Sequence, residues 1–354
     1  MEHLTKFNWH YIILDENQAI KNPDAQVTKA LQLLKAENRL ILSGTPVQNN
    51  TYDLFAQFNF INPGFLGQRE FFKQEFAGPI DKFGDKLKSE QLRRMVYPFM
   101  LRRTKEQVAT DLPDKTEMIL WCSMNKAQRG IYDEYKNYYR NMLLKKIDEE
   151  GMGKSGIYVL EGLLRLRQIC DHPALIKANT EVTNESVKTE ELTREIQENS
   201  GGHKLLVFSQ FTEMLHLISK ELEQAGITYC YLDGSTPAIK RKAEVNRFQE
   251  DESIKVFLIS LKAGGVGLNL TAADYVYLVD PWWNPAAEQQ AIDRTHRIGQ
   301  TRKIFAYKMI CKDTVEEKIL QLQQKKKTLA DDLINEESGF VKKLTKDDIA
   351  FLFS

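Results

Sequence analysis

The chain has 354 residues, 42% of them hydrophobic and 28% charged, and its 49 basic residues equal its 49 acidic ones in number. This composition is that of a globular protein of two or three domains, and it excludes the strong overall positive charge that marks many nucleic-acid-binding proteins. The four cysteines form no Cys-x-x-Cys pair, which argues against a disulfide framework and a structural zinc ion. No apolar run reaches the roughly 18 residues of a membrane span, and no signal peptide is recognisable. We therefore expect a soluble intracellular protein with no membrane partner.

Basic residues are nevertheless concentrated in a few places along the chain. Local patches of this kind can bind phosphate backbones even when the whole protein is neutral. The patches are Arg93–Arg94, Arg102–Lys105, Lys240–Lys242 and Lys325–Lys327.

The N-terminal region begins with a β-α-β pattern. The apolar run at residues 11–14 predicts a buried strand that ends in Asp15-Glu16. Asn22-Pro23 indicates the start of a helix, because Asn is a favoured cap and Pro fits the first helical position. A second apolar strand at residues 40–42 is followed by the turn Ser43-Gly44-Thr45-Pro46. This order predicts a parallel sheet with crossover helices.

The middle of the chain is predicted to be mainly helical. Residues 51–110 are rich in aromatic residues and typical of several short helices, and residues 123–172 form a longer helical region. Residues 177–202 are polar, largely acidic, and end in Ser200-Gly201-Gly202. We interpret them as a linker or an exposed helix between domains.

A second α/β region follows, in which strands and helices alternate. The predicted pattern is a doubly wound parallel sheet. Its strands are expected at residues 205–208, 227–232, 255–259, 275–279 and 304–310. A C-terminal helix then starts at Thr314 with a capping-box pattern, and its apolar stripe predicts that it docks on this second domain.

Two groups at the ends of the first strands suggest nucleotide chemistry. In nucleoside triphosphatases, an Asp placed like Asp15 holds Mg²⁺, and a Glu placed like Glu16 positions the attacking water. The alternative is a carboxylate pair that caps a neighbouring helix. The hydroxyls at residues 43–45 could sense a bound phosphate, or they could belong to an ordinary turn.

Two further groups lie in the second region. The Gly-rich segment 263–270 follows a predicted strand, has Lys262 at its start, and would allow backbone N–H groups to approach phosphate. Arg294 and Arg297 are three residues apart, so on a helix they would share one face about one turn apart and could together bind a phosphate chain. The alternative for the arginine pair is a solvated basic face.

In combination these segments resemble the motifs of one known family. Residues 15–22, 42–49 and 259–300 resemble motifs II, III, V and VI of the Swi/Snf-type ATPases of helicase superfamily two. Residues 207–211 resemble motif IV, and residues 166–173 resemble the segment that leads to the second lobe. The resemblance extends over nearly the whole chain. One departure is Asn17, where the family usually has Gly or Ala.

The resemblance implies a double-stranded DNA translocase with two RecA-like lobes, which binds ATP and Mg²⁺ between them. Asp15 and Glu16 would be the catalytic carboxylates, with Asp15 on Mg²⁺, and Arg294 and Arg297 would be arginine fingers. The other implied assignments are Gly267, Gln290 and Asp293 for ATP, Arg102, Arg103, Ser209, Lys262, Gly264 and Trp283 for DNA, and Ser43, Gly44 and Thr45 for coupling. For Trp283, a place in the hydrophobic core is the alternative.

The expected architecture is α/β, with four parts. Two RecA-like doubly wound lobes, the first incomplete, carry helical insertions and a C-terminal helix. The expected boundaries are 1–122 for the first lobe, 123–185 for a helical connection, 186–312 for the second lobe and 313–354 for a bracing helix and tail.

The phosphate-binding loop of the family, motif I, is not found in the sequence. Only 14 residues precede Asp15, and Gly153-Lys154-Ser155 does not fit the G-x-x-x-x-G-K-S pattern. We therefore expect an N-terminally truncated first lobe with exposed apolar faces and unpaired strand edges. We also expect that this chain alone does not hydrolyse ATP, and that a separate chain with the missing half is a candidate partner.

Other functions and partners stay open at this point. A DNA-binding module without catalysis is one alternative, and an RNA helicase of the same superfamily is another, although the run 280–285 argues against the latter. A nucleoprotein complex and RNA polymerase are candidate partners besides duplex DNA. The lack of a recognisable reader domain favours a bacterial protein of the cytoplasmic nucleoid, with a nuclear location if the protein is eukaryotic.

Overall fold

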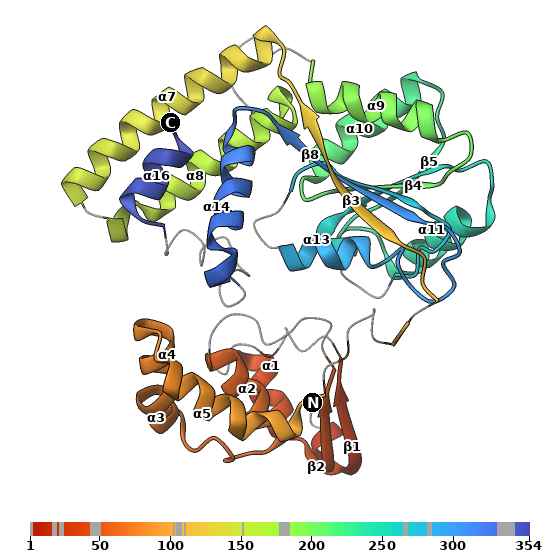
Figure 1. Ribbon diagram of the computed structural model, residues 1–354. Coiled ribbons are helices and arrows are strands. Elements are labelled where there is room, and N and C mark those ends of the chain that lie inside the picture. The colour runs from red at the N-terminus through yellow and green to blue at the C-terminus, as the bar shows by residue number, and fades with distance from the viewer. Residues whose placement is uncertain are drawn as a thin grey trace. The chain divides into compact units, whose positions relative to one another are not determined.

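The computed structural model describes residues 3–15, 20, 25–42, 51–101, 103, 108–109, 111–150, 152–176, 185–264, 268–281, 285–330 and 344–354. The chain divides into two compact units (Figure 1). Residues up to Val108 form the main part of the first unit, and residues from Ala109 onward form most of the second. Even the longest described helices lack the continuous apolar stretch that a bilayer would require.

The first unit contains a two-stranded parallel sheet. Strand β1 (Asn8–Leu14) and strand β2 (Lys35–Ile41) flank helix α1 (Gln26–Gln32), as the β-α-β pattern predicts. Both strands start earlier than the apolar runs that indicate them. The register pairs Leu14 with Ile41, and the Leu42 amide donates to the Leu14 carbonyl at 2.7 Å. The chain therefore leaves both strands at the same edge of the sheet. The expected helix cap at Asn22-Pro23 lies outside the described residues.

Several short helices follow, as predicted for residues 51–110. They are α2 (Thr51–Ile61), α3 (Arg69–Phe72), a π-helical turn (Lys73–Ala77), α4 (Gly78–Phe83) and α5 (Lys86–Val96). Their shared core is aromatic, with Phe55, Phe58, Phe72 and Phe76 buried together with Leu92. The Asp85 carboxylate begins α5 by accepting from the Leu87 and Lys88 amides.

The second unit contains a six-stranded parallel sheet in the order β3-β8-β7-β4-β6-β5. Its strands are β3 (Lys115–Cys122), β4 (Leu205–Ser209), β5 (Tyr229–Leu232), β6 (Val256–Ser260), β7 (Tyr275–Leu278) and β8 (Ile304–Cys311). Every residue of β4 and β6 is buried, which explains why these strands appear as continuous apolar runs. The prediction of a parallel α/β sheet is confirmed.

Strand β3 differs from the expected division of the chain. The sequence suggests that residues 1–122 belong to the first lobe, whereas β3 pairs with β8 over eight residues, from Lys115–Ile304 to Cys122–Cys311. This pairing makes β3 an edge strand of the second sheet. The boundary between the compact units consequently falls at Val108–Ala109 and not after Cys122.

Helices surround the second sheet (Figure 1). The long pair α7 (Lys126–Glu150) and α8 (Met152–Asp171) confirms the predicted helical region, and α16 (Lys346–Leu352) packs against α7. The remaining helices are α9 (Val187–Asn199), α10 (Thr212–Gln224), α11 (Ala238–Glu250), α12 (Leu261–Gly264), α13 (Pro285–Ile292) and α14 (Val315–Ala330).

Helix α9 is a structural part of the second unit and not the linker or exposed helix that its polar sequence suggests. Its first turn is capped by Ser186, and it buries Val187, Lys188, Leu192 and Ile196. The helix therefore packs through one face while its acidic residues cover the other.

Helix α14 docks on the second unit as expected, because Val315, Ile319 and Leu322 are all buried. Its start departs slightly from the predicted capping box. The Thr314 hydroxyl accepts from the Glu316 amide at 3.2 Å, and the Glu317 carboxylate accepts from the Asp313 amide at 2.7 Å.

Candidate functional site

In the first unit, Asp15 directly follows β1 at the carboxyl edge of the sheet. The residue is exposed, so its carboxylate is accessible to a ligand. Oxygen ligands of this kind suit Mg²⁺. Arg103 is also exposed. The predicted residues Glu16, Ser43, Gly44, Thr45 and Arg102 lie outside the described part of the chain.

In the second unit, three adjacent strands end beside one another. The order β7-β4-β6 places the ends of these strands at one edge of the sheet, where open α/β sheets bind ligands. Ser209 ends β4, α12 follows β6, and Asp280-Pro281 follows β7. The sequence motifs therefore converge at this edge. Gly267 and Trp283 belong to segments outside the described residues.

Ser209 does not have the exposure that a DNA contact requires. The residue is fully buried, and its hydroxyl lies 3.0 Å from the Phe211 amide, whose hydrogen bond it accepts. Beside it, both oxygens of the Asp280 carboxylate accept from the Gln210 amide, at 2.9 and 3.1 Å. The end of β4 is thus tied to the end of β7, and the structure gives Ser209 this local role.

Lys262 and Gly264 have different environments within the short helix α12. Lys262 is exposed and can reach a phosphate, whereas Gly264 is buried. A Cβ atom at position 264 would lie 2.9 Å from the Phe208 ring. The glycine is therefore required by close packing on Phe208. The expectation that Gly264 faces DNA does not fit this burial.

Helix α13 ends before the two arginines, which corrects the prediction that they share one helical face. The helix stops at Ile292. The Arg294 and Thr295 amides then donate to carbonyls three residues earlier, at 3.2 and 3.1 Å, and the Thr295 hydroxyl also donates to the Ile292 carbonyl. These bonds tighten the last turn and leave no continuing α-helical ladder. Arg294 and Arg297 are therefore presented by successive turns.

The two arginines also differ in exposure. Arg294 is only 2% exposed, and its carbonyl accepts from the Leu270 amide at 3.0 Å. Arg297 is half-buried. As the segment stands, Arg297 is the arginine that is accessible to a phosphate. The predicted ATP-binding residues Gln290 and Asp293 are half-buried on the preceding helix and turn, where Asp293 accepts from the Gln289 side chain at 3.1 Å.

Two interactions that the sequence does not reveal hold this segment in place. The Gln300 amide group donates to the carbonyls of Thr271 and Ala273, and its oxygen accepts from the Thr301 amide at 2.9 Å. On the opposite side, Glu288 of α13 pairs with Lys308 of β8 at 2.7 Å. The motif around residues 285–300 is therefore fastened to β8 through Glu288 and to the segment just before β7 through Gln300.

A basic groove lies next to the Gly-rich segment. It encloses about 390 Å³ between α11 and the residues that follow α12, and it is lined by Arg241, Lys242, Gln249 and Asn269. The Gln249 side chain bridges its base by donating to the Asn269 carbonyl at 2.8 Å. A groove with guanidinium and ammonium groups at its rim suits a phosphate backbone.

Comparison with known proteins identifies the family. Residues 1–175 match the SNF2-related domain, and residues 187–299 match the helicase conserved C-terminal domain. The solved Sulfolobus solfataricus SWI2/SNF2 ATPase core in complex with dsDNA is 35% identical, with a TM-score of 0.58 over 99% of this chain and 74% of that chain. The chain belongs to the SWI2/SNF2 family.

Two further relatives match this chain over its whole length. The putative ATP-dependent helicase/translocase YwqA of Bacillus subtilis is 37% identical over 100% of this chain and 38% of its own length. The TATA-binding protein-associated factor mot1 of Schizosaccharomyces pombe is 34% identical over 100% of this chain and 21% of its own length. The chain therefore spans about two-fifths or less of these relatives.

Proposed function

We propose that this chain is part of a DNA-stimulated ATPase motor that couples ATP hydrolysis to movement along duplex DNA. Two observations carry the proposal, one in each unit. An exposed carboxylate, Asp15, follows a strand of the first unit, and the accessible Arg297 follows the helix after β7 in the second. Similarity to an ATPase core solved with double-stranded DNA supports duplex DNA as the track.

ATP with Mg²⁺ is the cofactor that these groups fit. Asp15 offers a hard oxygen ligand for the metal ion, and Arg297 offers a guanidinium that can neutralise phosphate oxygens as charge develops. Lys262 and the basic groove beside it supply positive charge for the DNA backbone. In this proposal Asp15 and Arg297 act on the nucleotide, and Lys262 and the basic groove act on the track.

The proposal is tested by measuring ATP turnover in the full-length protein that contains these residues, without nucleic acid, with duplex DNA and with duplex RNA. We expect duplex DNA to be the strongest stimulator. Asp15→Asn should abolish the stimulation while the affinity for DNA changes by less than about threefold, because the carboxylate contacts the metal ion and not the track. Stronger stimulation by RNA would favour an RNA helicase, and DNA binding without turnover would favour a non-catalytic module.

We also propose that the motor acts on a protein bound to DNA. Support comes from the TATA-binding protein-associated factors among the relatives, which match this chain over its whole length. The measurement is the release of a DNA-bound protein from a labelled duplex, with ATP and with a non-hydrolysable analogue. Equal release with both nucleotides would contradict the proposal.

A further inference from the structure

Three consecutive residues at the end of β7 are each held by a different part of the second unit. The Lys188 ammonium of α9 donates to the Val279 carbonyl at 2.7 Å. The Gln210 amide, just after β4, donates to the Asp280 carboxylate. The Arg167 guanidinium of α8 donates to the Pro281 carbonyl at 2.9 Å. The chain therefore leaves the sheet along a path that is fixed at every residue.

Lys188 is the centre of this arrangement. Its ammonium also bonds to Asp171 at 2.8 Å and to Glu316 at 2.7 Å, and all three side chains are at most 1% exposed. These three bonds use all three donors of the group. Burial alone would lower the pKa of Lys188, but the carboxylates of Asp171 and Glu316 outweigh it and raise that pKa well above its ordinary value. Lys188 is therefore a permanent cation.

This permanent cation also explains a cluster that resembles a metal site. Cys170, Cys311 and Glu316 could each direct one ligand atom to a common point. However, Glu316 already bonds to Lys188 through one oxygen and accepts from the Cys311 amide through the other, at 3.0 Å. Burial further raises the pKa of both thiols, which disfavours their thiolate forms. Both oxygens of Glu316 are thus already used within the protein.

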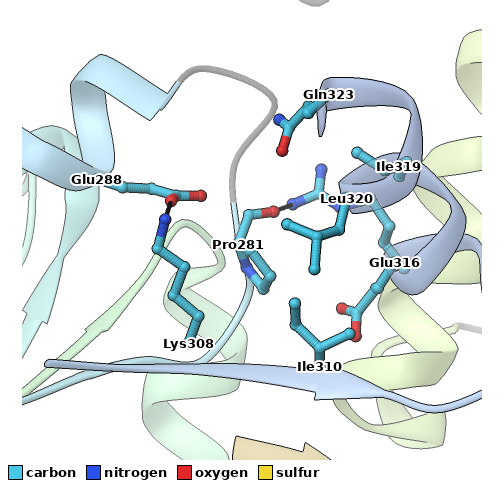
Figure 2. Close-up of a pocket in the computed structure, with 9 residues that line it drawn as sticks. Pro281, Glu288, Lys308, Ile310, Glu316, Ile319, Leu320 and Gln323 are labelled. Atoms are coloured by element: carbon cyan, nitrogen blue, oxygen red, sulfur yellow. Dashed lines mark hydrogen bonds and ion pairs between the residues drawn. The ribbon is translucent and has the colours of Figure 1, made fainter. Parts of the chain in front are cut away.

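The end of β7 is also enclosed by its neighbours. Figure 2 shows Pro281 beside a small cavity, with the Glu288–Lys308 pair on one side and Leu320 and Gln323 of α14 on the other. The free space is about 20 Å³, which is room for about one water molecule. The segment has little space in which to move as long as its carbonyls stay bonded.

We propose that Arg167 and Lys188 are positioning residues for the segment that presents Arg297. By holding Val279 and Pro281, they fix the direction in which the chain leaves β7, upstream of α13 and of the turns that carry Arg297. The consequence for hydrolysis rests on the proposed function, whereas the anchoring of residues 279–281 does not. The inference assigns this role to two helices, α8 with Arg167 and α9 with Lys188.

The test is hydrogen exchange of the full chain by mass spectrometry. The variant Lys188→Met/Asp171→Asn/Glu316→Gln removes the donor to Val279 without leaving a buried unpaired charge. The matched control is Lys204→Met, because Lys204 is also a buried lysine that donates to two carbonyls, those of Phe248 and Asp251. We expect amides in residues 279–292 to exchange at least about tenfold faster in the triple variant and at the native rate in the control.

A second variant, with a single substitution, tests the anchoring separately from the triple variant. Arg167→Met removes the donor to Pro281, together with the positive charge near Asp280 and the contact with the Phe211 ring. It should accelerate the same amides, while β4 and β6 exchange at their native rates. Native exchange at residues 279–292 in both variants would overturn the anchoring role.

DNA-stimulated hydrolysis then tests the consequence for Arg297. We expect kcat to fall by about tenfold or more with little change in the KM for ATP, because a displaced arginine costs transition-state stabilisation. Faster exchange with native kcat would overturn the positioning of Arg297 alone. Absence of hydrolysis in the unmodified full-length protein would overturn the proposed function. The hydrogen-exchange result would then still decide whether Arg167 and Lys188 anchor residues 279–281.

Discussion

The pKa of Asp280 depends on two opposing effects at the end of β7, burial and nearby positive charge. The carboxyl group is fully buried, and this burial raises its pKa from 3.8 to about 6, although Arg167 and Lys188 act in the opposite direction. The perturbation is Asp280→Asn, which keeps an oxygen that can accept from the Gln210 amide and removes the titration.

The magnitude follows from the pKa of Asp280 in the folded and unfolded states. A rise from 3.8 to about 6 corresponds to about 3 kcal/mol. Between these two pH values the unfolded chain has lost the proton and the folded chain has kept it. The stability that the neutral group contributes is therefore fully present below pH 3.8 and is lost as the pH rises through about 6.

The assay compares the slowest-exchanging amides of β4 and β6 in the wild type and the variant at each pH, so that the intrinsic pH dependence of exchange cancels. We expect the wild type to lose about 3 kcal/mol relative to Asp280→Asn between pH 4 and 7, which is about a 10²-fold change in the ratio of rates. Asp233→Asn is the control with the opposite sign, because hydrogen bonds from Ser235, Tyr231 and Thr236 outweigh partial burial and lower the pKa of Asp233.

Two other outcomes would contradict this prediction for Asp280. A ratio that is independent of pH would mean that the pKa of Asp280 is unshifted. A wild type that gains stability relative to the variant as the pH rises would mean that Arg167 and Lys188 outweigh burial and hold that pKa below 3.8.

Three further predictions concern the candidate site. Gly264→Ala should destabilise the second unit by about 1–3 kcal/mol in urea unfolding, because the new methyl group meets the Phe208 ring, and it should leave the salt dependence of DNA binding unchanged. Lys262→Ala should reduce the slope of log K against log salt by about 1 for duplex DNA, and an unchanged slope would show that Lys262 does not contact phosphate. Arg297→Ala should lower DNA-stimulated turnover of the full-length protein by about 10³–10⁵-fold, and native turnover would exclude the arginine-finger role.

The fold could be predicted well where burial is continuous along the chain. Strands β4 and β6 are buried on both faces, so their apolar runs are visible without any knowledge of their neighbours. Strand β3 could not be found in this way, because it mixes polar and apolar residues and is an edge strand whose neighbour in the sheet is β8. That partner begins at Ile304, far away in sequence from Lys115, and no local pattern encodes such a pairing.

The sequence predicts the position of the candidate site in the fold, but it does not predict which of the site's side chains are buried. Parallel strands place their carboxyl ends together, so the sequence motifs indicate the correct edge of the sheet. The burial of Arg294 and Ser209 depends on side chains that reach the same place from distant segments. The same reason explains why the polar sequence of α9 gave no sign that Lys188 would be buried.

The buried charges around Lys188 are better explained by geometry than by stability. Taking an ammonium and two carboxylates out of water is costly, and well-packed apolar residues of similar volume often stabilise a protein at least as well. An apolar side chain at position 188 could fill the same volume, but it could not donate a hydrogen bond to the Val279 carbonyl. The same holds for Arg167 and the Pro281 carbonyl. Because these two carbonyls flank Asp280 at the start of the segment that leads to Arg297, the buried charges lie where a fixed backbone path would matter most for the proposed activity.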